Sequence, residues 1–429
     1  MKNKLIVLSI DSLFDEDMAF FKTLPNFGKL LKKASYTEGG MRSIYPTLTY
    51  PVHTSIITGA SPQKHGIFQN EVLDPGNPKP DWYWYYRDIK ADTLLDVAKR
   101  AGLSTSAVGW PVMGGCPNVD YLVPEIWSFN ESEDIHPLFA KNSSANIMGD
   151  IFERHYHKLR TTHQPFFDFF LIGCATDILR RYRPDVMFIH LAHLDHMRHR
   201  NGLKGWMVKQ AILANDDWLG RIMEVTMDTG DYERTNFAVI SDHGHLAVKQ
   251  LFNPNILLAE KGFITLDSAG GIKDWKAFCQ PAGLSCQVAM KDPSDTSTRR
   301  LLESLLYGIR ANTEWKVESV FTKAETEREY RLTGNFEYVL EGRATVFGPA
   351  VTGPLLISAD SPDFKYPVAT HGHLPHKGAQ PVFIMSGPDI KENVVIPRQH
   401  ILDEAPTFAR ILGLSMPSAE GRVLEEFLK

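Results

Sequence analysis

The run LIVLSI at residues 5–10, followed directly by Asp11, decides the fold of this chain. It is rich in aliphatic and β-branched residues, a composition typical of a strand buried on both faces of a parallel sheet. Similar runs recur along the sequence: STSAVGW (104–110), DVMFIHLA (185–192), NFAVIS (236–241) and PVFIMSG (381–387). Because helical segments separate these runs, we predict an α/β fold with a doubly wound, mostly parallel sheet.

The segments between the runs carry helix signals. DTLLDVAKRAG (92–102) predicts a helix capped by Asp92 and ended by Gly102, and MVKQAILANDDWLGRIMEVTMDTG (207–230) has apolar residues at helical spacing. Residues 245–350 differ, because they combine one amphipathic helix, TSTRRLLESLLYGIRAN (296–312), with short strand-like pieces and many Gly, Pro and Lys. We therefore expect a catalytic core in two parts, residues 1–244 and 351–429, interrupted by a small α+β cap insertion at 245–350.

The composition excludes several classes of protein. Of the 429 residues, 43% are hydrophobic and 23% charged, and the net charge of −5 provides no basic field for a nucleic-acid polymer. The apolar run in MKNKLIVLSIDS is too short for a secretory signal or a membrane span, so no membrane association is expected. The four cysteines are widely spaced without a CxxC pair, which argues against disulfides and thiolate zinc and favours a reducing, cytoplasmic setting.

Potential metal ligands follow four of the predicted strands. They are Asp11 after LIVLSI, Asp195 and His199 in HLAHLDHMRHRNG, Asp242 and His243 in ISDHGH, and His371 in ATHGHLPHKG. Ligands of doubly wound sheets bind beyond the carboxyl ends of the strands, so these distant residues are expected to converge. Three carboxylates and three imidazoles without a thiolate suit two catalytic Zn²⁺ ions with open positions, and such a pair attracts a phosphate group.

Each of these residues also has an ordinary structural interpretation. A single Asp at a strand end is usually a helix cap or a turn residue, which applies to Asp11 by itself. Single histidines are usually surface or hydrogen-bonded core residues, and we interpret this group in that way: His53, His65, His136, His155, His157 and His163. The spacing of Asp195 and His199 places both on one face of a helical turn, and the adjacent Asp242 and His243 are the stronger signal. The joint pattern is more informative than any part of it.

The stretch IYPTLTYPVHTSIITGASPQKHGIFQN (44–70) contains the candidate nucleophile. A Thr hydroxyl needs a metal ion or a neighbouring base to react at neutral pH, and a helix N-terminus helps further. YPVHTSIITG predicts a short helix with Pro51 in its first turn and Gly59 after its end, which places Thr49 at the N-cap and Thr47 in the preceding loop. This favours Thr49, although a purely structural N-cap is the alternative.

Taken together, these motifs resemble the type I phosphodiesterase/nucleotide pyrophosphatase family of the alkaline phosphatase superfamily, in the form of a compact bacterial member. The resemblance covers, in order, VLSIDS, YPTLTYPVHTSIITGASPQKHGIFQN, HLAHLDHMRHRNG, ISDHGH and ATHGHLPHKGAQPVFIMSGPDI. It implies an alkaline-phosphatase-like core over roughly residues 4–244 and 350–415. Val52, the HRNG segment and His373 depart from the family pattern beside the metals or the leaving-group pocket, so the reaction type follows more directly than the substrate.

The resemblance assigns a role to each site residue. Thr49 would be the nucleophile, and Asn70 with the Thr49 backbone amide would hold a non-bridging phosphate oxygen. Tyr50 would offer an aromatic face to a nucleobase or another flat leaving group. One metal site would take Asp11, Thr49, Asp242 and His243, and the other Asp195, His199 and His371, with His371 preferred to His373 because it precedes the Gly of the HG pair.

The resulting hypothesis is a two-metal phosphodiesterase or nucleotide pyrophosphatase that acts through a threonyl-phosphate intermediate on small phosphodiester or nucleotide substrates. Two divalent ions are implied, with Zn²⁺ expected and Mn²⁺ an alternative in one site. The sequence predicts no oligomeric state. Another hydrolase of the superfamily, acting on phosphomonoesters, phosphonates or sulfate esters, is the first alternative, and an inactive metal-stabilised binding protein is the second.

Overall fold

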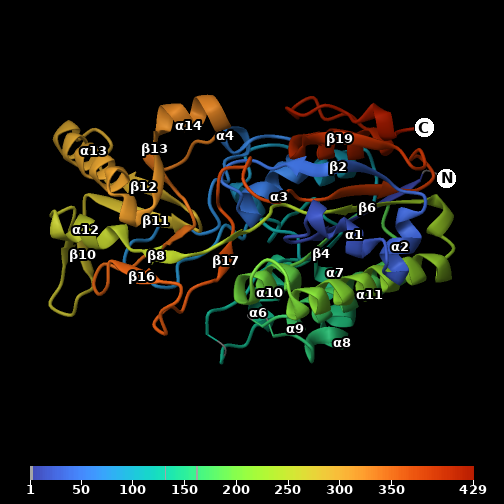
Figure 1. The fold of residues 1–429 in the computed structure, drawn as a ribbon. Coiled ribbons are helices and arrows are strands. Elements are labelled where there is room, and N and C mark those ends of the chain that lie inside the picture. Colours follow the sequence, from blue (N-terminus) through green and yellow to red (C-terminus); the bar gives the residue numbers. More distant parts are fainter. Residues whose placement is uncertain (1–2, 131, 161–162) are drawn as a thin grey trace.

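The computed structural model describes residues 3–130, 132–160 and 163–429, in which a sheet-centred core adjoins a smaller, β-rich part at one end (Figure 1). The core is built on an eight-stranded sheet. Its strands lie in the order β19 (Val395–His400), β2 (Ser35–Arg42), β18 (Phe383–Ser386), β6 (Thr235–Ile240), β1 (Lys4–Ile10), β5 (Val186–Leu191), β3 (Thr105–Val108) and β4 (Tyr121–Val123).

The pairing confirms the predicted mostly parallel sheet. β1 runs parallel to both of its neighbours, with Leu5 opposite Val186 of β5 and Asn236 of β6. Only β18 is antiparallel to its neighbours β6 and β2. A central strand such as β1 ends at the same edge as β5 and β6, and this brings the residues that follow all three strands together.

Helices cover both faces of the sheet, which explains why β1 is buried along its whole length. Ile6 and Leu8 pack with α2 (Pro25–Leu31), α9 (Phe166–Tyr182) and α11 (Trp206–Asp228) on one face. Leu5 and Val7 pack with α3 (Thr49–Thr58), α5 (Leu94–Arg100) and α15 (Glu404–Ile411) on the other. An apolar strand without alternation is the sequence signature of this two-sided burial.

The start of α5 differs from the prediction. Thr93, not Asp92, is the N-cap: its side chain accepts a hydrogen bond from the Asp96 amide, and Asp96 accepts in return from the Thr93 amide. This reciprocal capping box satisfies two amide donors at once, whereas Asp92 lies outside the helix and pairs with Arg100. The prediction of an Asp92 cap was therefore wrong by one residue.

The smaller part contains a four-stranded antiparallel sheet with its own hydrophobic cluster. The strands lie in the order β11 (Ala277–Ala282), β12 (Ser285–Met290), β14 (Tyr338–Gly342) and β13 (Val317–Thr322). The amphipathic helix α13 (Thr296–Ala311) packs on this sheet through Leu302, Leu306 and Ile309. Asp295 caps this helix by accepting hydrogen bonds from two backbone amides.

Short strands connect this part to the core. β8 (Gln250–Phe252) pairs with β15 (Thr345–Phe347) and β16 (Leu356–Ser358). β7 (Leu246–Ala247) pairs with β17 (Ala369–Thr370), which lies at the centre of Figure 1 between the two parts. β7 begins directly after His245, and β17 ends directly before His371.

The remaining helices and strands are short. They are α1 (Met18–Phe21), α4 (Pro62–His65), α6 (His136–Asn142), α7 (Ala145–Ile147), α8 (Glu153–Tyr156), α10 (His193–Asn201), α12 (Pro254–Glu260), α14 (Lys323–Tyr330), β9 (Ile264–Leu266) and β10 (Ile272–Trp275). Within the described residues, no helix has both the length and the apolar character needed to cross a bilayer.

Candidate metal centre

Two groups of potential metal ligands lie at the carboxyl edge of the central sheet. Ligand atoms within each group are all within 4.8 Å of one another. The first group is Asp11, Asp242 and His243, and the second is Asp195, His199, His245 and His371. These residues come from the ends of β1 and β6, from α10 after β5, and from the segment after β17.

The first group is fully buried and compact. The Nε2 atom of His243 lies 3.1 Å from Asp242 Oδ2 and 3.6 Å from Asp11 Oδ1. Asp242 Oδ2 is buried and makes no hydrogen bond. A carboxylate oxygen and an imidazole nitrogen that lie this close without a hydrogen bond present their lone pairs to the same space, which fits a bound cation.

Thr49 lies at the start of α3, where it adjoins the first group. Its Oγ1 atom is 3.3 Å from His243 Nε2. The structure places Thr49 at the first helical position and Leu48 at the N-cap, so the predicted N-cap assignment was wrong by one residue. Because Thr49 does not cap the helix, its hydroxyl group faces the candidate ligands and takes no part in helix capping.

Asn70 lies beside the same helix N-terminus. Its Oδ1 atom accepts a hydrogen bond of 3.0 Å from the Tyr50 amide. This bond fixes the orientation of the side-chain amide, because Oδ1 accepts from a backbone amide. Within the described chain, Nδ2 donates no hydrogen bond. Nδ2 is therefore left as a donor near the N-terminus of α3.

The second group contains one residue that the sequence did not single out. Asp195 Oδ2 lies 3.3 Å from His199 Nε2, and its Oδ1 lies 3.8 Å from His371 Nε2. His245 Nε2 lies 3.2 Å from the same Oδ1 atom. The signal for His245 was present in ISDHGH, where it follows the DHG triplet directly, but no family motif drew attention to it.

Hydrogen bonds orient three imidazoles of the centre in the same way. The Nδ1 atoms of His199 and His371 each lie 2.8 Å from a backbone carbonyl oxygen, that of Ala369 and that of Thr47, respectively. The Nδ1 atom of His245 lies 2.8 Å from the Ser12 hydroxyl group. Nδ1 bonds of this kind set the tautomer of metal-binding histidines and leave Nε2 for the metal.

The buried histidines outside both ligand groups include His53, His65 and His373. His53 bonds the Thr49 carbonyl oxygen through Nδ1 and the Ser9 hydroxyl group through Nε2, each at 2.8 Å. His65 bonds Ser55 through Nε2 and accepts from the Ile67 amide at Nδ1. The Nδ1 atom of His373 lies 2.8 Å from the Leu374 carbonyl oxygen. Full hydrogen bonding thus marks His53 and His65 as structural, and position separates His373 from the candidate ligands.

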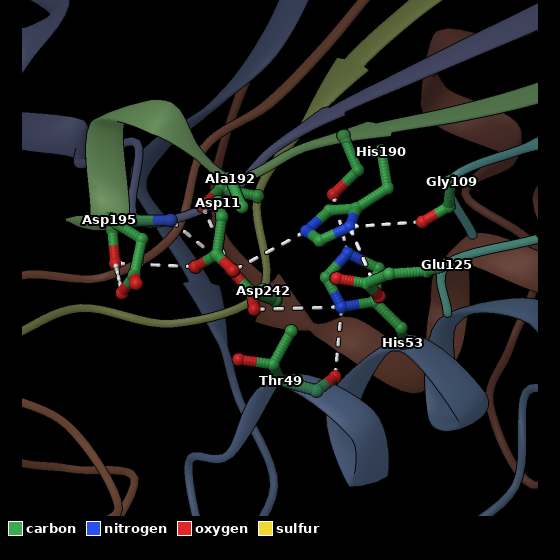
Figure 2. Close-up of polar contacts among 12 residues, drawn as sticks. Asp11, Thr49, His53, Gly109, Glu125, His190, Ala192, Asp195 and Asp242 are labelled. Carbon is green, nitrogen blue, oxygen red and sulfur yellow. Dashed lines mark hydrogen bonds and ion pairs between the residues drawn. The ribbon is translucent and has the colours of Figure 1, made fainter. Parts of the chain in front are cut away.

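Further polar side chains contact Asp11 and Asp242 on the side that faces away from Asp195 (Figure 2). His190 Nε2 lies 3.3 Å from Asp11 Oδ2, and His53 Nδ1 lies 3.5 Å from Asp242 Oδ2. Glu125 lies next to His190, with its Oε2 atom 3.7 Å from His190 Nδ1. Burial raises the pKa of Glu125 to about 7. These side chains align the carboxylates and separate them from the apolar core.

The buried carboxylates of the candidate centre favour a bound cation. Burial raises the pKa of Asp11 well above its usual range, and the nearby Asp195 raises it further. Burial and the neighbouring Asp11 raise the pKa of Asp242 in the same way. Two buried carboxylates that repel each other are stabilised as anions by a divalent cation between them.

The ring of Tyr50 does not offer the exposed aromatic face that the resemblance implied. Its ring is completely buried, and Trp82 packs edge-on against it with the ring centroids 5.2 Å apart. A buried ring has no free face for a leaving group, so the predicted stacking surface is not present at Tyr50. The covering residue comes from the aromatic run DWYWYYRD (81–88), whose Trp84 belongs to the hydrophobic core and whose Trp82 packs against it.

Comparison with known proteins places this geometry in context. The family model for type I phosphodiesterase/nucleotide pyrophosphatase matches residues 5–360. Ectonucleotide pyrophosphatase/phosphodiesterase family member 1 of Homo sapiens is 27% identical over 233 residues, which are 52% of this chain and 21% of that protein. Venom phosphodiesterase of Naja atra is 22% identical over 257 residues, or 58% of this chain and 27% of that protein. The chain thus matches only about a quarter of the length of these relatives.

Solved structures agree on the fold. Murine ectonucleotide pyrophosphatase/phosphodiesterase 5 superposes with a TM-score of 0.70 at 16% identity, covering 99% of this chain and 100% of that chain. An inactive variant of the same murine protein, in complex with AMP, gives the same TM-score and identity and covers 100% of both chains. The similarity supports an alkaline-phosphatase-like α/β fold for the whole described chain.

Proposed function

Because the chain belongs to the type I phosphodiesterase/nucleotide pyrophosphatase family, we propose that it is a two-metal hydrolase of phosphodiester or pyrophosphate bonds in small nucleotide-like substrates. The observation that carries this proposal is the position of Thr49. Its hydroxyl group lies at a helix N-terminus, 3.3 Å from His243 Nε2 and beside two buried carboxylates. Among the described residues of the 44–70 stretch, Thr49 is the one whose side-chain hydroxyl group is hydrogen-bonded to a candidate metal ligand.

Each residue has a defined part in the proposed reaction. Asp11, Asp242 and His243 with Thr49 would hold one divalent ion, and Asp195, His199 and His371 the other. Bound divalent ions would stabilise negative charge on the attacking and leaving oxygens. Thr49 Oγ1 attacks phosphorus, the alcohol or phosphate leaving group departs, and water hydrolyses the threonyl-phosphate ester to regenerate the hydroxyl group. Zn²⁺ fits the donor set, with Mn²⁺ as the alternative in one site.

Asn70 would hold the phosphoryl group during this sequence. Its free Nδ2 donor and the backbone amide of Thr49 both lie at the N-terminus of α3, where the helix dipole favours an anion. Both donors are neutral, which suits the single negative charge of a diester better than the double charge of a monoester. This favours hydrolysis of a diester over hydrolysis of a phosphomonoester.

Replacing Thr49 tests the proposal directly. Thr49→Ala should abolish hydrolysis of bis-p-nitrophenyl phosphate, because the attacking oxygen is lost, while zinc analysis still finds close to two ions per chain. Thr49→Ser is the matched control and should retain turnover, since it keeps the hydroxyl group. Undiminished activity of Thr49→Ala would remove Thr49 from the role of nucleophile. Faster turnover of p-nitrophenyl phosphate than of the diester would favour the monoesterase alternative.

We further propose that residues 245–350 form a cap on the core parts 1–244 and 351–429. Three glutamine side chains bond across this junction: Gln69 donates to the Pro281 carbonyl oxygen, Gln280 to that of Glu71 and Gln287 to that of Phe68. These contacts tie β11 and β12 to the loop that carries Asn70. The cap therefore supports the phosphate-binding side of the proposed site.

A reducing, cytoplasmic setting is part of the same proposal. All four cysteines are free and buried. Cys279 and Cys286 lie on the paired strands β11 and β12 without forming a disulfide. Cysteines that form no disulfides are typical of proteins from reducing compartments.

A further inference from the structure

We propose that His245 is a direct ligand of the metal ion held by Asp195, His199 and His371, so that this ion has four protein ligands. The inference rests on the two-metal centre of the proposed function and adds a residue to it. It also makes the two metal positions chemically different, because one ion would have four protein side-chain ligands and would take a substrate oxygen only as a fifth ligand, whereas the other would have three such ligands besides Thr49.

The backbone places His245 next to His371. In the antiparallel pair β7–β17, Leu246 lies opposite Thr370 and Ala247 opposite Ala369. Continuing this register by one residue sets His245 against His371, and their ring centroids are 5.2 Å apart. The ring of His245 also lies 4.6 Å from that of His199. The position of His245 is therefore set by strand pairing and not by a flexible side chain.

Ser12 determines which nitrogen of His245 is free. The Ser12 hydroxyl group has one proton, and at 3.1 Å from Asp195 Oδ1 this proton is donated to a carboxylate, which can only accept. The Ser12 oxygen, 2.8 Å from His245 Nδ1, must then accept the Nδ1 proton of the imidazole. The Nε2 atom of His245 is left with its lone pair, as in His199 and His371.

That lone pair has no other partner within the described chain. His245 is 1% exposed, and its Nε2 atom forms no hydrogen bond although it lies 3.2 Å from Asp195 Oδ1. A buried acceptor without a donor is unfavourable, and two acceptors facing each other at this distance are more so. A cation between His245 Nε2 and Asp195 Oδ1 removes both penalties.

Four protein ligands have a chemical consequence. Three imidazoles and one carboxylate complete the tetrahedral coordination that Zn²⁺ prefers, and imidazole-rich sites favour Zn²⁺ over Mn²⁺ or Mg²⁺. The group of Asp11, Asp242 and His243 supplies only three protein ligands, so its fourth position is left for Thr49 Oγ1. We expect the ion at the histidine-rich position to bind more tightly and to exchange more slowly.

The experiment compares metal binding by the wild-type protein and His245→Gln. In the variant, one of the two ions should bind at least about 100-fold more weakly in a chelator competition titration, because a direct ligand is lost. With Co²⁺ at this position, the intense visible absorption of a four-coordinate site should weaken in the variant. An unchanged Co²⁺ spectrum would overturn the proposal, whatever the affinity. His196→Gln on α10, which lies outside both ligand groups, is the matched control and should bind both ions as the wild type does.

A second measurement uses the wild-type protein and does not depend on a variant that folds. The chain is labelled with ¹⁵N-histidine and loaded with two ¹¹³Cd²⁺ ions, and couplings between cadmium and imidazole nitrogen are counted. Three imidazoles coupled to one ion and one to the other support the proposal. Two imidazoles coupled to the first ion overturn it.

These readouts are independent of catalysis. A wild-type protein that binds two ions but does not hydrolyse bis-p-nitrophenyl phosphate would disprove the proposed function and still decide whether His245 is a ligand. Conversely, an active wild type and an inactive Thr49→Ala, together with an unchanged Co²⁺ spectrum in His245→Gln, would leave the function in place and overturn the role of His245.

Discussion

At the scale of residues, hydrogen bonds from His371 and Gly372 to Thr47 set the position of His371. The Gly372 amide donates to the Thr47 hydroxyl oxygen at 3.0 Å, and His371 bonds the Thr47 carbonyl oxygen. Gly372 has φ +85, and a Cβ atom at this position would lie 1.8 Å from the Ala282 carbonyl oxygen in the cap hairpin. Only glycine fits there, because both the backbone conformation and the space exclude a side chain.

Gly372→Ala should therefore displace the segment that carries His371. We expect a loss of more than about 2 kcal/mol in the free energy of unfolding, measured by urea titration, together with weaker binding of one metal ion. Gly102→Ala is the matched control, because Gly102 has φ +76 but nothing within 4 Å of the added Cβ atom. It should cost about 1 kcal/mol and leave metal binding unchanged. Equal effects of both substitutions would show that the clash at Gly372 is relieved by a small shift.

At the scale of elements, strand β14 connects the cap to the loops on either side of the site. Glu341 on this strand is completely buried and accepts three hydrogen bonds, from the Tyr45 hydroxyl group, the Leu374 amide and the Lys377 ammonium group. Tyr45 belongs to the loop before α3, and Leu374 follows His371 by three residues. One carboxylate thus joins the loop before Thr49, the proposed cap and the segment that carries the candidate ligand His371.

The protonation of Glu341 should make this connection depend on pH. Burial raises its pKa from 4.5 to about 7, against the opposing effect of Lys377. Between these two values the folded protein holds a proton that the unfolded chain releases, so the contribution of Glu341 to stability is complete below pH 4.5 and is lost as pH rises to about 7.

Comparison with Glu341→Gln isolates this contribution. The stability of the wild type relative to the variant should fall by about 3 kcal/mol between about pH 4.5 and 7.5, measured by urea unfolding at each pH. The glutamine side chain of the variant keeps an acceptor for the Tyr45 hydroxyl group but does not titrate in this range. A pH-independent difference between the two proteins would mean that Lys377 keeps Glu341 ionised in the folded state.

At the scale of the whole molecule, the candidate metal centre brings together segments from residue 11 to residue 371. Each candidate ligand group joins segments that are more than 170 residues apart in the chain, and the rings of His243 and His371 stack between the two groups with centroids 3.8 Å apart. Bound ions at this junction would link the sheet, α10 and the segment after β17. Without them, burial and neighbouring carboxylates raise the pKa values of Asp11 and Asp242 well above their usual range, so that the anionic forms are disfavoured.

Removal of metal should therefore lower the melting temperature. Ions present at about 1,000 times their dissociation constant each add about 4 kcal/mol to stability, so treatment with EDTA should reduce the Tm by several degrees, and added Zn²⁺ should restore it. Differential scanning calorimetry measures the shift. Activity should disappear and return in parallel. A protein that was inactive before treatment and loses only thermal stability would support the metal-stabilised binding protein, and an unchanged Tm would contradict a metal role in the fold.

The sequence by itself determined the α/β class and the convergence of Asp11, Asp195, His199, Asp242, His243 and His371, because apolar runs identify buried parallel strands and such strands end at one edge of a sheet. The predicted N-caps of α3 and α5 were wrong by one residue, because adjacent residues can each take the capping position. Only the tertiary structure decided the burial of Tyr50 and the place of His245. Trp82 covers Tyr50 from a loop 32 residues further along the chain, and the β7–β17 pairing brings His245 close to His371, which is 126 positions away in the chain. Contacts of this kind depend on packing and strand register, which no local pattern in the sequence encodes.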